Sequence, residues 1–230
     1  MVGMRINKIN FPIYGIIVLT SIFIGMLYIY INLRKEKTSH LLLFFSFYLI
    51  FSFVCGKLFT IVASSFKYSF QDATLSSYGG FIGVILAAIV YEIIYPSNKK
   101  VIKYATISLP LVYGLSKIAC FVSGCCYGLP YYSSFSVIYT DGLNIPLFPV
   151  QILETIVFIG IFIWCHRNRE NRYIVYTTII ISALFKFSLD FFRYEHLSKV
   201  ITINQWFSIG LIIVVRTILS IKYYMDNKSK

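Results

Sequence analysis

The fold of this chain is decided first by residues 11–33, which read FPIYGIIVLTSIFIGMLYIYINL. These residues contain no Asp, Glu, Lys or Arg, and about 20 apolar residues are enough to cross the hydrocarbon core of a bilayer as an α-helix. Arg5 and Lys8 precede the stretch, as basic residues precede a secretion signal. However, the stretch is too long for a signal peptide and no small-residue cleavage site follows it, so we expect a retained membrane helix.

Six further apolar stretches of similar length follow along the 230 residues. They lie at 41–63, 78–95, 104–121, 150–166, 174–192 and 201–223. Apolar residues make up 58% of the chain and charged residues 13%, whereas a soluble domain is about one quarter charged. We find no internal repeat and no linker that would separate two domains. The sequence therefore predicts an all-α integral membrane protein, a bundle of about seven transmembrane helices forming one domain over residues 1–230.

The distribution of basic residues predicts the orientation of this bundle. The net charge of +12 lies in short Lys/Arg clusters between apolar spans, which favours the lipid bilayer rather than nucleic acid as the partner. Twelve basic residues follow the odd-numbered spans: Arg34, Lys35, Lys37, Lys99, Lys100, Lys103, Arg167, Arg169, Arg172, Lys222, Lys228 and Lys230. The opposite side has four: Arg5, Lys8, Lys67 and Lys199. The positive-inside rule then places the N-terminus outside and the C-terminus in the cytoplasm.

Three lysines, Lys57, Lys117 and Lys186, interrupt the apolar spans. A cation at the centre of a bilayer costs roughly 2.5 to 3.5 kcal/mol on insertion scales, so it is retained where it faces partner helices, a water-filled cavity or an anionic ligand. Three such residues predict a polar pocket within the bundle. The commonest anion at that depth is a lipid phosphate.

Other polar residues share helix faces with these lysines or lie near them. Lys186, Asp190 and Arg193 are spaced four and three apart and lie on one face, where Asp190 either neutralises its neighbours or takes part in a site. Gln151 and Glu154 likewise share a face, and Glu154 either positions a cation or balances its charge. Gly79-Gly80 opens a predicted helix, where free N–H groups can bind an anion. Gly83 is better explained by close helix packing.

The longest connection, residues 123–149, contains no Lys or Arg and is rich in turn-forming residues and tyrosines. We expect an outward-facing loop that either folds back over the bundle or forms a simple interfacial cap. Cys55 and Cys165 lie in spans and are expected to be packing residues. Cys125-Cys126 has no second pair at zinc-like spacing, so the sequence implies no metal and no cofactor.

Residues 116–128, SKIACFVSGCCYG, resemble the signature of the prolipoprotein diacylglyceryl transferase family. Members typically read Gly-Arg-x-Gly-(Asn/Cys)-Phe-x-Asn-Gly, then three residues and Gly. Further motifs are similar in the same order from end to end. They are Tyr14-Gly15, Gly56-Lys57-Leu58, residues 77–83 (SYGGFIG), residues 149–154 (PVQILE), Phe185-Lys186 through Asp190 and Arg193, and residues 203–208 (INQWFS). The family also has seven spans with the N-terminus outside.

The resemblance implies transfer of a diacylglyceryl group from phosphatidylglycerol to the lipobox cysteine of a preprolipoprotein signal peptide, in the bacterial cell membrane. The products are a thioether and glycerol phosphate. The implied catalytic residues are Tyr78, Lys117 and Lys186. The implied substrate-binding residues are Tyr14, Lys57, Gly79, Gly80, Cys120, Ser123, Gly124, Gly128, Gln151, Glu154, Asp190 and Arg193.

Several of these positions depart from the family pattern. Lysine stands at 57, 117 and 186 in place of arginine, which keeps the charge but loses the planar fork that binds two phosphate oxygens. Tyr78 stands in place of histidine and is a poor base near neutral pH, so His196 is a second candidate for the base. Two alternatives follow: a lipid-phosphate transferase or binder with another acceptor, and a channel or transporter. The second lacks the paired broken helices of transporters.

Overall fold

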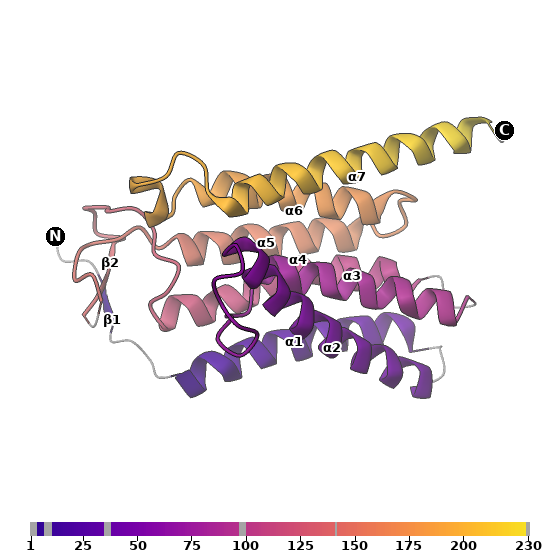
Figure 1. Ribbon diagram of the computed structural model, residues 1–230, viewed down its shortest axis with the longest axis horizontal. Coiled ribbons are helices and arrows are strands. Elements are labelled where there is room, and N and C mark those ends of the chain that lie inside the picture. The colour runs from indigo at the N-terminus through magenta and orange to yellow at the C-terminus, as the bar shows by residue number, and fades with distance from the viewer. Residues whose placement is uncertain (1–3, 7–10, 35–37, 97–99, 141, 229–230) are drawn as a thin grey trace. The chain divides into compact units, whose positions relative to one another are not determined.

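The computed structural model describes residues 4–6, 11–34, 38–96, 100–140 and 142–228 (Figure 1). Five of the basic residues used to predict the orientation lie outside the described residues: Lys8, Lys35, Lys37, Lys99 and Lys230. The predicted orientation of the termini therefore stays a prediction.

An α-helix occupies each of the seven predicted positions in the described chain. These are α1 (Phe11–Leu33), α2 (Thr38–Ala63), α3 (Ser77–Ile94), α4 (Val101–Val122), α5 (Val150–Arg167), α6 (Ile174–Asp190) and α7 (Ile203–Lys228). Six are long and apolar enough to cross a membrane, whereas α6 has 17 residues and is shorter. The helix ends agree with the predicted ends to within three residues, except that α7 continues to Lys228.

The outer surfaces of these helices carry large apolar side chains. Leu19 and Phe23 on α1 are each 64% exposed, and Ile93 on α3 is 71% exposed. Continuous apolar surface of this kind is unfavourable in water and favourable in lipid. Length, composition and exposure together are those of an all-α membrane protein.

The chain divides into two compact units, which are described separately. Unit 1 comprises Met1–Ile22 and Pro110–Lys230, and unit 2 comprises Phe23–Leu109. One boundary falls inside α4 at Pro110, where the missing N–H removes one helix hydrogen bond. Whether the two units fold as the predicted single domain stays a prediction.

In unit 2, α2 packs closely against α3 because α3 presents glycine at the contact. A Cβ on Gly79 would lie 2.1 Å from the Cys55 carbonyl oxygen, and one on Gly83 would lie 2.3 Å from that of Phe51. The predicted packing role of Gly83 is therefore confirmed, and Gly79 shares it. Small residues at helix contacts permit such close approach.

In unit 1, α5 packs against α6 and α6 against α7 (Figure 1). Residues 123–149 fold around a small core of Val137, Tyr139 and Leu147. The strand β2 (Val137–Tyr139) pairs in parallel with β1 (Met4–Ile6), in the register Met4 with Val137. This two-stranded sheet was not predicted, because each strand has only three residues and its partner lies more than 130 positions away. Phe121 at the end of α4 packs on the same core, and the Leu129 N–H donates to the Phe192 carbonyl at 2.9 Å, so the connection is joined to the ends of α4 and α6. Whether it covers the bundle or caps it at the interface stays a prediction.

Candidate active site

Two of the three lysines that predicted a polar pocket, Lys117 and Lys186, lie in a group of five charged side chains in unit 1, which we call the ion cluster. The third, Lys57, lies in unit 2. It consists of Lys117 from α4, Glu154 from α5, Lys186 and Asp190 from α6, and Arg193 just beyond α6. Each is at most 7% exposed. The 3.6-residue period brings Lys186 and Asp190 to one face of α6, where they form an i,i+4 ion pair of 3.6 Å. The one-face prediction is thereby confirmed for Lys186 and Asp190, whereas Arg193 lies beyond the end of α6 in extended backbone.

Glu154 lies at the centre of the ion cluster and is fully buried. Lys117 Nζ is 3.2 Å from its Oε2, Lys186 Nζ is 3.0 Å from its Oε1, and Arg193 Nη2 donates to both oxygens at 2.9 and 3.2 Å. The hydroxyl of Tyr113 donates to Oε1 at 2.8 Å. An ionised carboxylate has about four lone-pair sites, so the acceptor capacity of Glu154 is used in full.

The ion cluster carries an excess of positive charge. Its three cations face two carboxylates, which leaves one net positive charge when all five groups are ionised. Lys117 and Lys186 also lie 4.8 and 5.4 Å from the centre of the Tyr113 ring, whose negative face attracts cations. Each lysine has three N–H donors, so both retain capacity for an anionic ligand.

Asp190 is held by the start of α7. Thr202 donates a hydrogen bond from its hydroxyl to Asp190 Oδ2. Thr202 and Gln205 also form a reciprocal capping box, in which the Thr202 N–H donates to Gln205 Oε1 at 2.9 Å and the Gln205 N–H to Thr202 Oγ1 at 3.2 Å. The other carboxylate oxygen of Asp190, Oδ1, lies 3.1 Å from Arg193 Nε. The helix cap thereby positions one carboxylate of the ion cluster.

The ion cluster lies near the C-terminal ends of α4 and α6 and near the N-terminal end of α5. Lys117 is five residues before the end of α4, Glu154 is four residues after the start of α5, and Lys186 is four residues before the end of α6. At 1.5 Å per residue these positions are about 6 to 8 Å from the helix ends. The loop at residues 123–149 begins at one of these ends, so the ion cluster lies near this loop.

The α4 C-terminus turns sharply at Ser123 and Gly124. The Cys125 N–H bonds the Cys120 carbonyl at 3.0 Å, the Gly124 N–H bonds that of Phe121 at 3.4 Å, and Gly124 has φ 60°. These two bonds with a left-handed glycine define a Schellman motif. The Gly124 N–H is therefore engaged within the turn, whereas the buried hydroxyl of Ser123 has no hydrogen-bond partner among the described residues.

This turn brings three cysteines together, which we call the thiol cluster. The sulfur atoms of Cys120, Cys125 and Cys126 all lie within 4.8 Å of one another. Hydrogen bonds from Cys120 and Cys125, together with the charges of Lys117 and Arg193, hold the pKa of the Cys126 thiol well below its usual range. Tyr14 on α1 also contacts the Cys120 thiol. The three cysteines are close in the sequence near the end of a predicted span, but the sequence did not predict that their sulfurs converge, because Cys120 approaches the other two only through the reversal at Gly124.

Gln151 and Gly128 position the backbone around the ion cluster. Gln151 is buried and donates through Nε2 to the Cys125 carbonyl at 2.7 Å. Gly128 pairs with Arg193 in an antiparallel bridge, and a Cβ on Gly128 would lie 2.1 Å from the Phe148 carbonyl oxygen. Only glycine fits at position 128, so the close approach of the backbone to Phe148 is a structural reason for glycine there.

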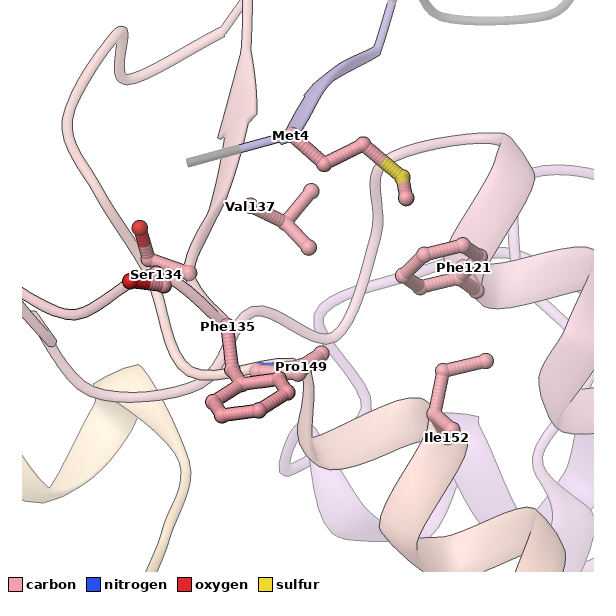
Figure 2. A pocket seen from close by; sticks show the side chains of 8 residues that line it. Met4, Phe121, Ser134, Phe135, Val137, Pro149 and Ile152 are labelled. Carbon is pink, nitrogen blue, oxygen red and sulfur yellow. The ribbon is translucent and has the colours of Figure 1, made fainter. Parts of the chain in front are cut away.

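A mostly apolar pocket of about 220 Å³ lies at the loop at residues 123–149 and the adjoining ends of α4 and α5 (Figure 2). Its lining residues are Met4, Phe121, Ser134, Phe135, Ser136, Val137, Pro149 and Ile152. Figure 2 shows the side chains of Val137, Phe121 and Ile152 directed into it. None of its lining residues belongs to the ion cluster.

Four predicted site residues lie in unit 2. Lys57 Nζ donates to the carbonyls of Phe70 and Gln71 at 2.8 and 3.2 Å and so ties the α2–α3 loop to α2. Tyr78 stacks on Phe59 with ring centres 5.7 Å apart. The Gly80 N–H bonds the Ser76 carbonyl at 3.0 Å, and Gly79 is packed against α2. Their predicted roles toward the substrate stay predictions.

Sequence reasoning missed two contributors to the site. Tyr113 precedes Lys117 by four residues, so helical spacing alone would have placed it on the same face. Thr202 precedes Gln205 by three residues at the start of an apolar run, which is the sequence signature of a capping box. Both signals were present in the sequence.

These features define a class: a multi-pass helical membrane protein with a buried, cation-rich polar site. The family model for prolipoprotein diacylglyceryl transferase matches residues 1–221, and the chain belongs to this family.

A Clostridium perfringens protein named phosphatidylglycerol–prolipoprotein diacylglyceryl transferase 2 is 29% identical over 149 residues, covering 59% of this chain and 56% of that protein. Proteins named phosphatidylglycerol–prolipoprotein diacylglyceryl transferase are similar too. One from Clostridium tetani is 30% identical over 60% of this chain and 59% of its own length. One from Mannheimia succiniciproducens is 26% identical over 67% and 60%. The chain thus spans less than two thirds of the length of the curated relatives it matches.

Proposed function

We propose that this chain transfers a diacylglyceryl group from phosphatidylglycerol to the thiol of the lipobox cysteine of a prolipoprotein, in the bacterial cell membrane. Membership of the family supports the reaction class. The observation that carries the assignment to this chain's own residues is the single excess positive charge of the ion cluster. A phosphodiester carries one negative charge, so a bound phosphatidylglycerol headgroup would bring the ion cluster to neutrality.

The ion cluster favours the departure of the phosphate. The sulfur of the lipobox cysteine attacks the carbon of the diacylglyceryl group that is bonded to the phosphate oxygen. A C–S bond forms, and the C–O bond to the phosphate breaks with its electrons passing to the phosphate. The leaving glycerol phosphate then gains a second negative charge. Lys117 and Lys186 are assigned to this charge because their spare N–H donors are buried, where electrostatic interactions are strong.

The thiol proton must leave before the sulfur becomes a useful nucleophile. Tyr78 and His196 are the candidates for the group that accepts it. His196 Nε2 is buried without a hydrogen-bond partner among the described residues, so its nitrogen is available. Tyr78 stacks on Phe59, which fixes the plane of its ring.

The apolar pocket of Figure 2 is our candidate for the binding site of the acceptor peptide. The loop at residues 123–149 forms most of it, at the helix ends and not between helices in the bilayer, where acyl chains would lie. We assign to it an aliphatic side chain of the signal peptide, because its lining is mostly apolar.

The test is a lipidation assay with purified protein, phosphatidylglycerol vesicles and a lipobox peptide, read by mass spectrometry. We expect a diacylglyceryl adduct on the peptide cysteine. Lys117→Ala is expected to abolish the adduct while the protein stays folded, because two cations and two carboxylates remain balanced. Lys117→Arg keeps the charge and is expected to retain activity. Lys199→Ala, which changes an exposed lysine, is the matched control.

Two outcomes would overturn the proposal in different ways. Full activity of Lys117→Ala would remove the ion cluster from phosphate stabilisation. Release of glycerol phosphate without a peptide adduct would indicate a different acceptor. In the same assay, loss of activity in Tyr78→Phe or in His196→Ala identifies the base.

A further inference from the structure

The thiol cluster has the chemistry of a metal site. The resemblance implies a substrate-binding role for Cys120, but no step of the proposed lipid transfer is assigned to the three sulfur atoms. Cys120 is buried, Cys125 and Cys126 are half-buried, and all three are free thiols. Each offers one sulfur, and the three sulfurs lie within 4.8 Å of one another. Cys55 and Cys165, the other two cysteines, are not part of this group.

The backbone holds the three sulfurs on one side of the turn. The Schellman motif at Gly124 reverses the chain, and Cys126 itself adopts φ 55°. A left-handed conformation is uncommon for a residue with a Cβ. Gln151 fixes the next peptide by donating to the Cys125 carbonyl at 2.7 Å. The cysteine sulfurs are therefore brought together by a defined turn before any ligand arrives.

The spacing of the sulfurs suits a single small ion. A metal–sulfur bond of about 2.3 Å in a planar three-sulfur site puts the sulfurs about 4 Å apart, a little closer than the upper limit seen here. Thiolate ligands select soft ions such as Cu(I) and Zn²⁺ over hard ones such as Mg²⁺ or Ca²⁺. The described residues supply no fourth ligand to this group, which leaves either a three-coordinate site or an open fourth position.

The surroundings favour the charge of such a complex. Three thiolates with one Cu(I) carry a net charge of −2, and with one Zn²⁺ a net charge of −1. Lys117 and Arg193 lie close to Cys126. The ion cluster next to them carries an excess positive charge, so a negatively charged metal–thiolate group would be stabilised.

We propose that Cys120, Cys125 and Cys126 form a binding site for one soft d¹⁰ metal ion, of the class of Cu(I) and Zn²⁺. Binding releases the thiol protons to the solvent and changes no oxidation state. The proposal concerns sulfur ligands of the chain itself and not the thiol of the substrate. It draws on the same excess positive charge as the transferase proposal, so metal binding and lipid binding are measured separately.

Cd²⁺ is the probe, because it is soft and its thiolate complexes absorb in the ultraviolet. The full chain is purified in detergent without oxygen, and its thiols are counted first after denaturation. We expect five free thiols, one bound Cd²⁺ per chain and a charge-transfer band that saturates at one equivalent. Cys120→Ser, Cys125→Ser and Cys126→Ser are each expected to weaken binding by more than about tenfold.

Cys55→Ser is the matched control, because it removes a half-buried thiol from α2 and is expected to leave the band unchanged. Thermal unfolding of each serine variant shows whether it is folded. Three results would overturn the proposal: only three free thiols, which indicates a disulfide; no band with five free thiols; or equal weakening by Cys55→Ser. Unchanged binding in all three folded thiol-cluster variants would overturn it as well.

Discussion

Glu154 is the residue on which the ion cluster depends. It accepts from four side chains while fully buried, and every cation of the ion cluster contacts it. Burying an ion pair gives little net stability, because desolvation offsets the attraction. Removing one partner is different, since the remaining charges stay buried without compensation. Glu154 therefore has a structural role in addition to any role in the reaction.

Replacing Glu154 with Gln should destabilise the protein strongly. The variant leaves three cations and one carboxylate, so the net charge of the buried group rises from +1 to +2. We expect a loss of roughly 3 to 5 kcal/mol in the free energy of unfolding. Thermal unfolding in detergent measures it.

Glu170→Gln is the control for this change. The Glu170 side chain is 82% exposed and lies 3.6 Å from Arg169, so its loss should cost less than about 0.5 kcal/mol. Equal unfolding temperatures for the two variants would show that the ion cluster does not need its central carboxylate.

The residues of the ion cluster were predictable to different degrees. Helical spacing alone placed Lys186 and Asp190 together, because a face of one helix is a local property. Arg193 reaches Asp190 from extended backbone beyond α6, which helical spacing does not describe. That Glu154 would contact Lys117 and Lys186 depends on how three helices pack, which spacing within one helix does not determine. The resemblance grouped these positions without giving their contacts. The nearness of Cys120, Cys125 and Cys126 was visible in the sequence, but the convergence of their sulfurs was missed because it depends on the turn at Gly124.

At the scale of the element, the α2–α3 contact depends on the absence of side-chain atoms. Gly79 and Gly80 are neighbours that both lie near α2, but only at Gly79 is the contact too close for a Cβ. A Cβ on Gly79 would overlap the Cys55 carbonyl oxygen, whereas one on Gly80 would meet its nearest atom at 3.9 Å. The sequence predicted that glycines here serve packing or anion binding, and it had no means of telling the two neighbours apart.

Substituting each of these glycines with alanine should have opposite effects. Gly79→Ala forces α2 and α3 apart, and we expect a loss of about 1 to 3 kcal/mol or more. Gly80→Ala fits and removes glycine from a helix interior, so a gain of up to about 0.5 to 1 kcal/mol is expected. Unfolding temperatures of the two variants measure the difference.

The same pair also tests the predicted anion site. A stable Gly80→Ala variant that loses lipid transfer would support a role for this position in substrate binding. A Gly79→Ala variant as stable as the parent would contradict the close packing of α2 on α3.

At the scale of the whole molecule, the sequence predicted the class and the helix positions well. Each span is a local apolar run with a length fixed by the bilayer, so its position follows from composition alone. The β1–β2 pairing was missed because it joins two three-residue segments that are distant in sequence. The orientation in the membrane is a different kind of property, since it depends on charges in the connections and on the membrane itself.

The orientation of the chain determines in which leaflet of the membrane the ion cluster lies. The ion cluster lies about 6 to 8 Å from the helix ends at which the loop at residues 123–149 begins. An outside position of that loop would put the ion cluster in the outer leaflet.

Cysteine labelling of cells with a membrane-impermeant maleimide tests this, with the parent chain as background. Tyr132 is 80% exposed in the loop, and the Glu170 side chain is 82% exposed in the α5–α6 connection. We expect Tyr132→Cys to be labelled in intact cells and Glu170→Cys only after permeabilisation. The reverse pattern would place the basic connections outside, and the ion cluster would then face lipids and peptides of the cytoplasmic leaflet.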